Sequence, residues 1–299
     1  MGTRHGRRWH QRVIALAALA GGVLAVPAWA APNSGRLSFS FGNDITTAYF
    51  FRGIVQNRSG FIDQPYGEVD VNLWTADEDD PGPFNNLTLL GGLWFSFHSD
   101  DVGHSGSSGP RHIYETDYYG GLKTTMFKNL TLGTIWYAYT FPSAAFKVAQ
   151  ELDLTAAYND ADLLGPFALN PSVVFGIEVD NTAFGTKKGD YVGVGIAPGY
   201  KFFPDATYPV TLTMPCTLGL GIGNYYEDAG SQDAFGYFSG GFKASVPLAF
   251  IPEEFGAWSA SAGVQVLTFG NNVDQYNTAF TQNTTDPWVV GTWSINMTY

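Results

Sequence analysis

The chain has 299 residues, with 15 Lys and Arg against 27 Asp and Glu, a formal net charge of −12. Such an acidic chain lacks the basic face that nucleic-acid binding requires, so no nucleic-acid partner is expected. The single cysteine, Cys216, cannot pair within the chain, which excludes a disulfide scaffold. Charged residues make up only 14% while aromatic residues reach 16%, which is less charge than a soluble secreted enzyme normally carries.

Residues 1–30 are predicted to be a secretory signal peptide. Four arginines from Arg4 to Arg12 precede an apolar run over 13–26, and Ala28 to Ala30 supply the small residues of a cleavage site. The run is too short for a membrane anchor. Removing four basic residues and no acidic one leaves 11 − 27 = −16 on residues 31–299. This remainder is predicted to be one domain, and it has no apolar stretch long enough for a transmembrane helix.

Alternating strands dominate the pattern after the signal peptide. The clearest is the last one, where large apolar residues from Trp293 to Tyr299 occupy the odd positions and small polar residues such as Ser294 and Asn296 occupy the even ones. This period of two places one face in an apolar medium and the other in water. Twelve such segments are predicted: 36–51, 64–74, 86–98, 113–126, 130–140, 149–158, 167–180, 190–202, 209–225, 235–247, 257–269 and 287–299.

The predicted connections also alternate. Long Gly-, Asn- and Asp-rich segments follow odd strands, and several tight turns follow even ones, although 75–85 and 248–256 are long where a short turn is expected. We therefore predict an all-β fold: a single antiparallel transmembrane β-barrel of about twelve strands in the bacterial outer membrane, with short periplasmic turns and longer extracellular loops. The uneven connections leave ten or fourteen strands open.

Charged side chains recur on the polar faces of these strands, where parity predicts that they line the lumen. The set has nine acidic and three basic members: Asp44, Arg52, Glu68, Asp70, Glu115, Asp117, Lys123, Glu151, Asp153, Glu178, Asp180 and Lys243. A wet lumen with this surplus would prefer cations. The alternative is a narrow barrel whose interior is filled by these groups as salt bridges.

Aromatic residues cluster near the predicted strand ends, which favours two interfacial girdles facing lipid over a sandwich core. The clusters are Tyr49 to Phe51, Tyr137 with Tyr139 and Phe141, Tyr200 with Phe202 and Phe203, Tyr225 with Tyr226, and Trp258.

Three groups could suggest other chemistry. A metal could bind around one loop (His98, Asp100, Asp101, His104 and His112), and Ca²⁺ around the acidic run 77–80, but neither has a regular ligand spacing. Ser96, His98 and Asp100 resemble parts of a lipid hydrolase, but parity turns them toward the lumen rather than the lipid. We expect no metal site, no cofactor and no catalytic residue.

Residues 44–56 (DITTAYFFRGIVQ) resemble the opening of the TorF-like porin family, in which an aromatic strand end is followed by Arg-Gly, a spacer and Gln. Here these positions are Tyr49 to Phe51, Arg52, Gly53 and Gln56. The final strand, ending at Tyr299, is similar to the signal by which outer-membrane barrels engage the barrel-assembly machinery. The resemblance implies a porin-like protein of the outer membrane.

The expected function is therefore passive diffusion of small solutes, with a cation preference from the acidic lumen, in contact with outer-membrane lipid and without a chemical step. Arg52 could pair with the carboxylates and narrow the pore. The alternative is a closed structural or surface-binding barrel that acts through its extracellular loops.

Overall fold

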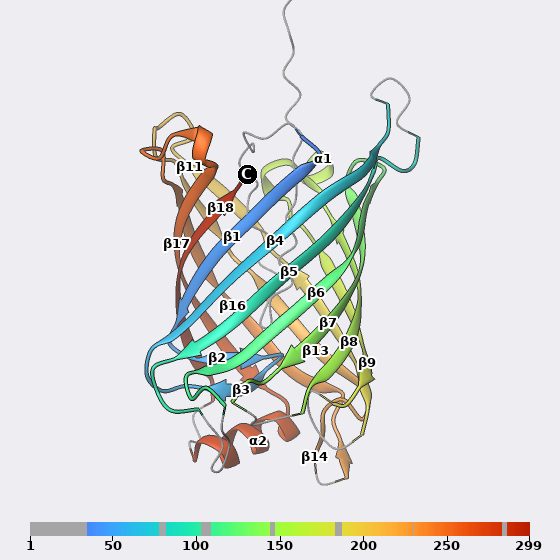
Figure 1. Ribbon diagram of the computed structural model, residues 1–299, viewed down its shortest axis with the longest axis vertical. Coiled ribbons are helices and arrows are strands. Elements are labelled where there is room, and N and C mark those ends of the chain that lie inside the picture. The colour runs from blue at the N-terminus through green and yellow to red at the C-terminus, as the bar shows by residue number, and fades with distance from the viewer. Residues whose placement is uncertain are drawn as a thin grey trace, which may run out of the picture.

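The computed structural model describes residues 35–77, 82–102, 109–143, 147–182, 187–228, 230–282 and 286–299. The predicted signal peptide lies outside this part of the chain. The fold is a closed barrel of twelve antiparallel strands (Figure 1). Its wall is made of β1 (Leu37–Thr46), β4 (Ile62–Thr75), β5 (Asn86–His98), β6 (Ile113–Met126), β7 (Leu130–Thr140), β8 (Ala149–Tyr158), β9 (Ser172–Asp180), β10 (Gly189–Ile196) with β11 (Gly199–Phe202), β12 (Val210–Thr213) with β13 (Cys216–Gly223), β16 (Phe235–Pro247), β17 (Ala257–Phe269) and β18 (Trp288–Thr298).

Each wall strand pairs with its neighbours in the sequence, and β1 closes the barrel by pairing with β18. Pro198 and Pro215 interrupt two adjacent wall strands, because proline has no N–H to donate to the ladder. The register is unchanged across these breaks, since Ile196 pairs with Cys216 and Gly199 with Thr213. The predicted count of twelve strands is confirmed.

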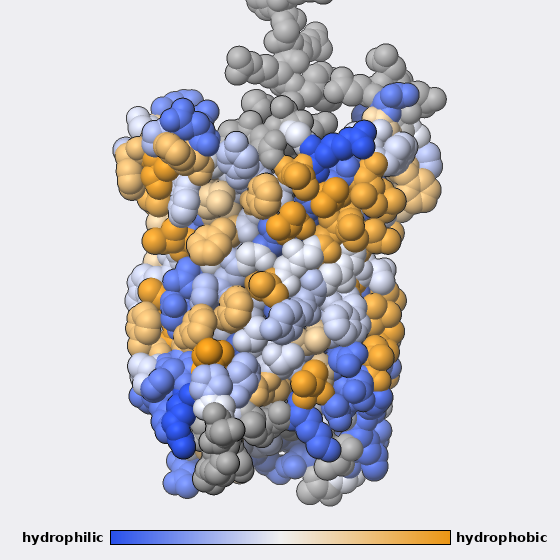
Figure 2. Space-filling view, viewed as in Figure 1, coloured by the Kyte–Doolittle hydropathy of each residue, from blue (hydrophilic) through white to orange (hydrophobic). Residues whose placement is uncertain are grey.

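The alternation read from the last strand is confirmed in space. Trp293 and Ile295 are 52% and 50% exposed on the outer face of β18, whereas Ser294 and Asn296 are buried inside. Many other wall strands present large apolar side chains outward in the same way, among them Phe41, Leu89, Leu122, Trp136, Leu154, Phe242 and Val264. Apolar side chains are spread over the outer wall, and hydrophilic ones gather at the end that carries α2 and β14 (Figure 2).

The first predicted strand ends earlier than expected, at Thr46. The chain then forms a separate two-stranded hairpin from β2 (Tyr49–Phe51) and β3 (Ile54–Asn57), which lies inside the barrel rather than in its wall (Figure 1). Helix α2 (Asn271–Thr281), in a connection expected to be irregular, lies at the same end as the hairpin, with the short pair β14 (Glu227–Asp228) and β15 (Ser231–Gln232).

The opposite end of the barrel holds both ends of the described chain (Figure 1). It also carries α1 (Ala161–Leu164), the one-turn helices Gly165–Phe167 and Glu253–Phe255, and the three-residue turn after Met126. Among the described residues, none of the helices combines the length and apolar character needed to cross a membrane.

Candidate functional site

The candidate site is built around the tip of the inward hairpin. Phe51 pairs with Ile54, which leaves Arg52 and Gly53 as a two-residue turn with φ of +48° and +84°. Positive φ at both central positions is the pattern of a type I′ turn, whose twist suits tight hairpins. Glycine adopts this conformation freely, but arginine does so at a cost of about 1–2 kcal/mol. A non-glycine residue in this conformation is more common at functional sites.

The hairpin spans the barrel interior because its two faces pack on different walls. Tyr49 and Phe51 join one buried aromatic cluster with Trp94, Tyr114 and Tyr139 of β5, β6 and β7.

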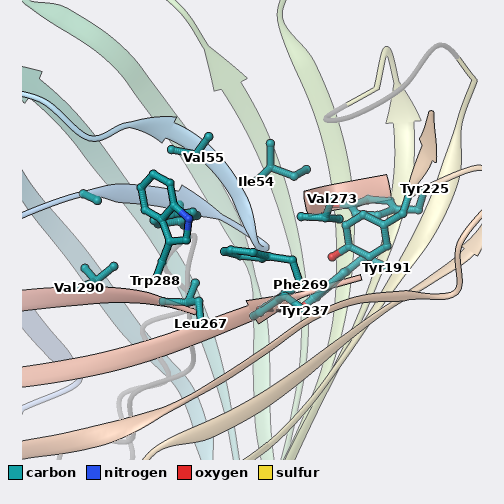
Figure 3. Close-up of a cluster of buried hydrophobic side chains, with 13 residues drawn as sticks. Ile54, Val55, Tyr191, Tyr225, Tyr237, Leu267, Phe269, Val273, Trp288 and Val290 are labelled. Atoms are coloured by element: carbon teal, nitrogen blue, oxygen red, sulfur yellow. Dashed lines mark hydrogen bonds between the residues drawn. The ribbon is translucent and has the colours of Figure 1, made fainter. Parts of the chain in front are cut away.

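The other hairpin face contacts the far wall (Figure 3). Phe50, Ile54 and Val55 join Phe269 of β17 and Trp288 of β18 in a second cluster. The Phe50 ring lies 5.7 Å from that of Phe269 and 5.2 Å from that of Trp288. The hairpin is therefore held by both walls across the interior.

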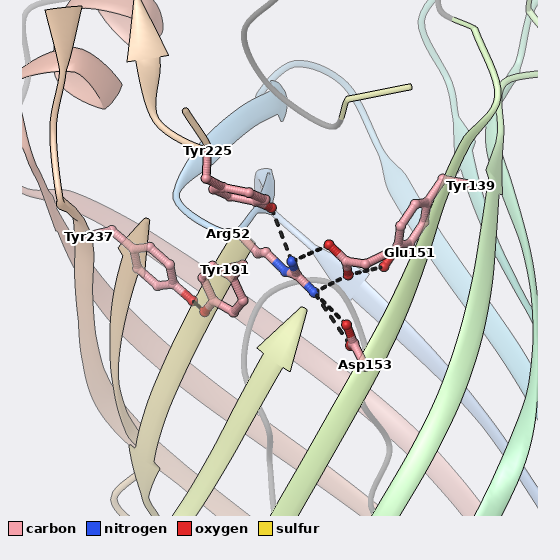
Figure 4. A network of polar contacts seen from close by, with 7 residues as sticks. All are labelled: Arg52, Tyr139, Glu151, Asp153, Tyr191, Tyr225 and Tyr237. Atoms are coloured by element: carbon pink, nitrogen blue, oxygen red, sulfur yellow. Dashed lines mark hydrogen bonds and ion pairs between the residues drawn. The ribbon is translucent and has the colours of Figure 1, made fainter. Parts of the chain in front are cut away.

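Arg52 places its guanidinium in a polar network on β8 (Figure 4). Nη1 donates to Glu151 Oε2 at 2.6 Å and to the Tyr225 hydroxyl at 3.1 Å, and Nη2 donates to Glu151 Oε1. Asp153 forms a further ion pair with Nη2 at 3.4 Å. The guanidinium carbon also lies 4.0 Å from the centre of the Tyr191 ring. This geometry combines a bidentate carboxylate with a cation–π contact.

The charge of Arg52 is secure in this buried position. Burial alone would lower the pKa of the guanidinium, but Glu151, Tyr225 and Asp153 raise it, and the net shift is well above the usual value. Gly176 of β9 makes room for the network, because a Cβ there would lie 2.8 Å from Nη1 and 2.9 Å from Asp153 Oδ1.

The hairpin backbone is clamped from the end of the barrel that carries α2. The buried Asn277 side chain accepts a hydrogen bond from Val55 N and donates one to Gly53 O, both at 2.9 Å. The Tyr226 hydroxyl donates to Arg52 O at 2.9 Å. Three bonds from two separate connections therefore fix the turn.

The remaining sequence-predicted charges fall into smaller groups. Lys123 of β6 reaches past β5 to Glu68 and Asp70 of β4, at 3.2 and 3.0 Å. Asp44 and Lys243 are partly buried, and each charge favours the ionised form of the other.

Two other buried carboxylates, Glu115 and Asp117, have no cation within ion-pair distance in the described part of the chain. Glu115 instead accepts a hydrogen bond from the Tyr49 hydroxyl at 2.8 Å. Glu178 is buried and accepts one from Gly189 N. Asp180, by contrast, is exposed: a bulge opposite Gln150 breaks the parity after Glu178.

Most of the predicted aromatic girdle lies inside the barrel. Tyr49, Phe50, Phe51, Tyr137, Tyr139, Tyr225 and Tyr226 are all buried, so the girdle prediction is wrong for them. The physical reason is that the hairpin needs an apolar seat within an otherwise polar interior. Tyr200 and Phe203 are 57% and 69% exposed, near the end of the barrel that holds the termini, and are placed as a girdle requires.

Ser96 and His98 form a triad-like group with Asn57, a residue that the sequence did not single out. Ser96 Oγ lies 2.8 Å from His98 Nε2, and Asn57 Nδ2 lies 2.5 Å from His98 Nδ1. The Asn57 oxygen already accepts from the backbone N–H groups of Arg58 and Ser59. The amide N–H must therefore donate to Nδ1, which places the proton of a neutral ring on Nε2.

In this tautomer His98 donates to Ser96 and cannot take its proton, as a general base must. Ser96 is also fully buried. The group holds the hairpin to β5 through His98 and Asn57. His104 and residues 78–80 of the acidic run lie outside the described residues. Within the described part, no cluster of three or more His, Cys, Asp or Glu could hold a metal ion.

Comparison with known proteins gives structural matches only. No protein-family model and no curated protein matches the chain. It is similar to the β domain of the Bordetella autotransporter BrkA, with 10% identity over 89% of this chain and 99% of that one, at a TM-score of 0.44. An outer membrane channel from Pseudomonas putida F1 shares 14% sequence identity over 88% of this chain and 94% of that one, at a TM-score of 0.44. A bacterial polysaccharide outer membrane secretin shares 10% sequence identity over 88% of this chain and 97% of that one, at a TM-score of 0.38.

Proposed function

We propose that the chain is an outer-membrane channel for small solutes, constricted by the hairpin of residues 47–61. A bilayer location is supported by the outer wall, whose exposed side chains include Trp293, Ile295, Phe242 and Leu122. Apolar belts of this extent are unusual on soluble proteins. A closed barrel also satisfies every backbone group within its wall, which lipid requires.

The observation that carries the channel proposal is the polar inner wall beyond the hairpin. Lys123 with Glu68 and Asp70, and the inward residues Ser294 and Asn296, line the half of the barrel toward the termini. A polar inner wall suits a solvent path, whereas a closed barrel would pack the same groups against one another as salt bridges. The hairpin is then the narrowest element along the path.

The proposed cation preference rests on fewer groups than the sequence suggested. Arg52 and Lys123 each face two carboxylates and Lys243 faces Asp44, so these three cations offset three of the five carboxylates and leave a formal charge of −2. Glu115 and Asp117, next to the hairpin, add two further carboxylates to this surplus. Selection would be electrostatic and steric, without a chemical step.

The proposal includes export through the signal peptide of residues 1–30 and assembly through the strand that ends at Tyr299. The likeness to TorF-like porins rests on Arg52, Gly53 and Gln56, all of which lie in the hairpin. Tyr114 donates to Gln56 Oε1 at 2.7 Å, so this motif residue also ties the hairpin to the wall.

The test is conductance of refolded residues 31–299 in a planar bilayer, compared with a variant in which residues 48–57 are replaced by a short Gly-Ser linker. We expect small or infrequent openings from the intact chain and large, steady openings from the variant. Glu115→Gln with Asp117→Asn should reduce the cation preference measured in a salt gradient. A linker variant that folds as a heat-modifiable barrel and never conducts would refute the channel.

A second candidate is a closed barrel that acts through its outer connections. It is favoured by one observation, the hairpin's contact with both walls through Phe51 and Phe50. Absence of conductance from both the intact chain and the linker variant would favour this function.

A further inference from the structure

The wall of the barrel holds a complete binding site for a guanidinium group. Four of its side chains converge on one point: Glu151 and Asp153 from β8, Tyr191 from β10, and Tyr225 from the connection after β13. The wall residues are fixed independently of the ligand, since the Tyr139 hydroxyl donates to Glu151 Oε1 at 3.1 Å and Tyr191 hydrogen-bonds Tyr237 at 3.0 Å. Arg52 is the one group in the site that comes from the hairpin.

The chemistry of this site selects a planar cation. Glu151 binds the two Nη atoms side by side, which an ammonium cannot reproduce, and the guanidinium carbon lies over the Tyr191 ring, 4.0 Å from its centre. Glu151 and Asp153 are 1% and 3% exposed, so both would be buried carboxylates without a cation if Arg52 left. Leaving such charges uncompensated is strongly unfavourable, and an external guanidinium would remove that penalty.

A ladder of tyrosine rings leads from this site along the inner wall. The Tyr139 ring is stacked on Tyr137 at 5.7 Å and 5°, and Tyr137 on Tyr119 at 5.3 Å and 30°. Tyr119 lies beside Glu68, a carboxylate of the polar half of the interior. The ladder therefore joins the guanidinium site to the polar half of the interior.

We propose that this site recognises solutes that carry a guanidinium group and that Arg52 is its built-in occupant. An incoming guanidinium competes with Arg52, and its binding releases the tip of the hairpin from β8. Binding itself is independent of the proposed channel. The passage of such solutes past the released hairpin rests on that function.

The test is chemical rescue of Arg52→Ala with ethylguanidinium, which carries the atoms that this substitution removes. Hydrogen exchange of residues 49–57 in the refolded barrel should accelerate in the variant. Ethylguanidinium at about 10 mM should slow it again by about tenfold or more. In the native chain, where it displaces Arg52, the same probe should accelerate exchange instead. Ethylammonium should not rescue. Arg58→Ala is the matched control, because Arg58 lies on the same hairpin and donates to Thr281 O instead.

If Arg52→Ala does not fold, Arg52→Gly removes the same group and suits the left-handed backbone at this position. Titration calorimetry of that variant with ethylguanidinium then measures binding directly. No binding to a folded variant, or equal rescue by ethylammonium, would overturn the proposal. Rescue in a barrel that never conducts would support the guanidinium site while refuting the channel.

Discussion

The strongest local prediction concerns Asn277, whose side chain holds both edges of the hairpin turn. Asn277→Ala leaves Val55 N–H and Gly53 C=O without their partner in a buried position. Each unsatisfied buried group costs about 1–3 kcal/mol, so the two together destabilise the seated hairpin by at least about 2 kcal/mol. Since 1.4 kcal/mol is tenfold in an equilibrium, local opening should become at least about 30-fold more frequent.

Hydrogen exchange measured by mass spectrometry on the refolded barrel tests this value. Peptides that cover 49–57 should exchange faster by that factor, while those from β6 and β7 should not change, because local opening leaves the wall intact. Asn271→Ala is the matched control, since Asn271 lies on the same helix with its side chain exposed. Unchanged exchange at 49–57, or an equal change in both variants, would refute the clamp.

Three further predictions test the seat of the hairpin, the interior charges and the outer face. Gly53→Ala should loosen the hairpin by about 1–3 kcal/mol in the same exchange assay, whereas Gly230→Ala, with a similar φ but open space around it, should leave the hairpin unchanged. Lys123→Met leaves Glu68 and Asp70 without this cation and should lower the free energy of unfolding in urea by about 3 kcal/mol. Lys147→Met, at an exposed position, should change it little, and equal losses in both variants would count against the buried ion pairs. Ile295→Arg should lower the free energy of unfolding from lipid vesicles by about 2–4 kcal/mol, because it places a charge on the outer wall. Phe167→Arg, at the end of the barrel, should leave it nearly unchanged, and a small and equal effect of both would argue against a lipid-facing wall.

The sequence predicted the wall well because every wall strand carries the same two-sided constraint. Strands such as β5, β6 and β8 have the predicted bounds, since apolar side chains outside and polar groups inside impose a strict period of two. In the described residues of the two long connections that made the count uncertain, 75–85 and 248–256, no extra wall strand is inserted.

The hairpin could not be predicted in the same way. Tyr49 to Phe51 continue the aromatic pattern of a strand end, and nothing local distinguishes a ring that faces lipid from one that faces a plug. The rule that inward positions are polar also fails near the hairpin. Trp288 and Val290 lie on the inner face of β18, whose other inward residues are polar. Gly53 was the available sequence signal for a hairpin, because glycine favours the positive φ that a two-residue turn requires.

The hairpin and the seat on which it rests come from opposite ends of the chain. The hairpin follows the first wall strand, but Phe269 and Trp288, on which Phe50 rests, belong to the last two strands. The seam between β1 and β18 is also formed by the first and last wall strands. Seating of the hairpin and closure of the seam therefore both require the C-terminal strands, so a chain truncated before them would lose the closed wall and the seat of the hairpin together.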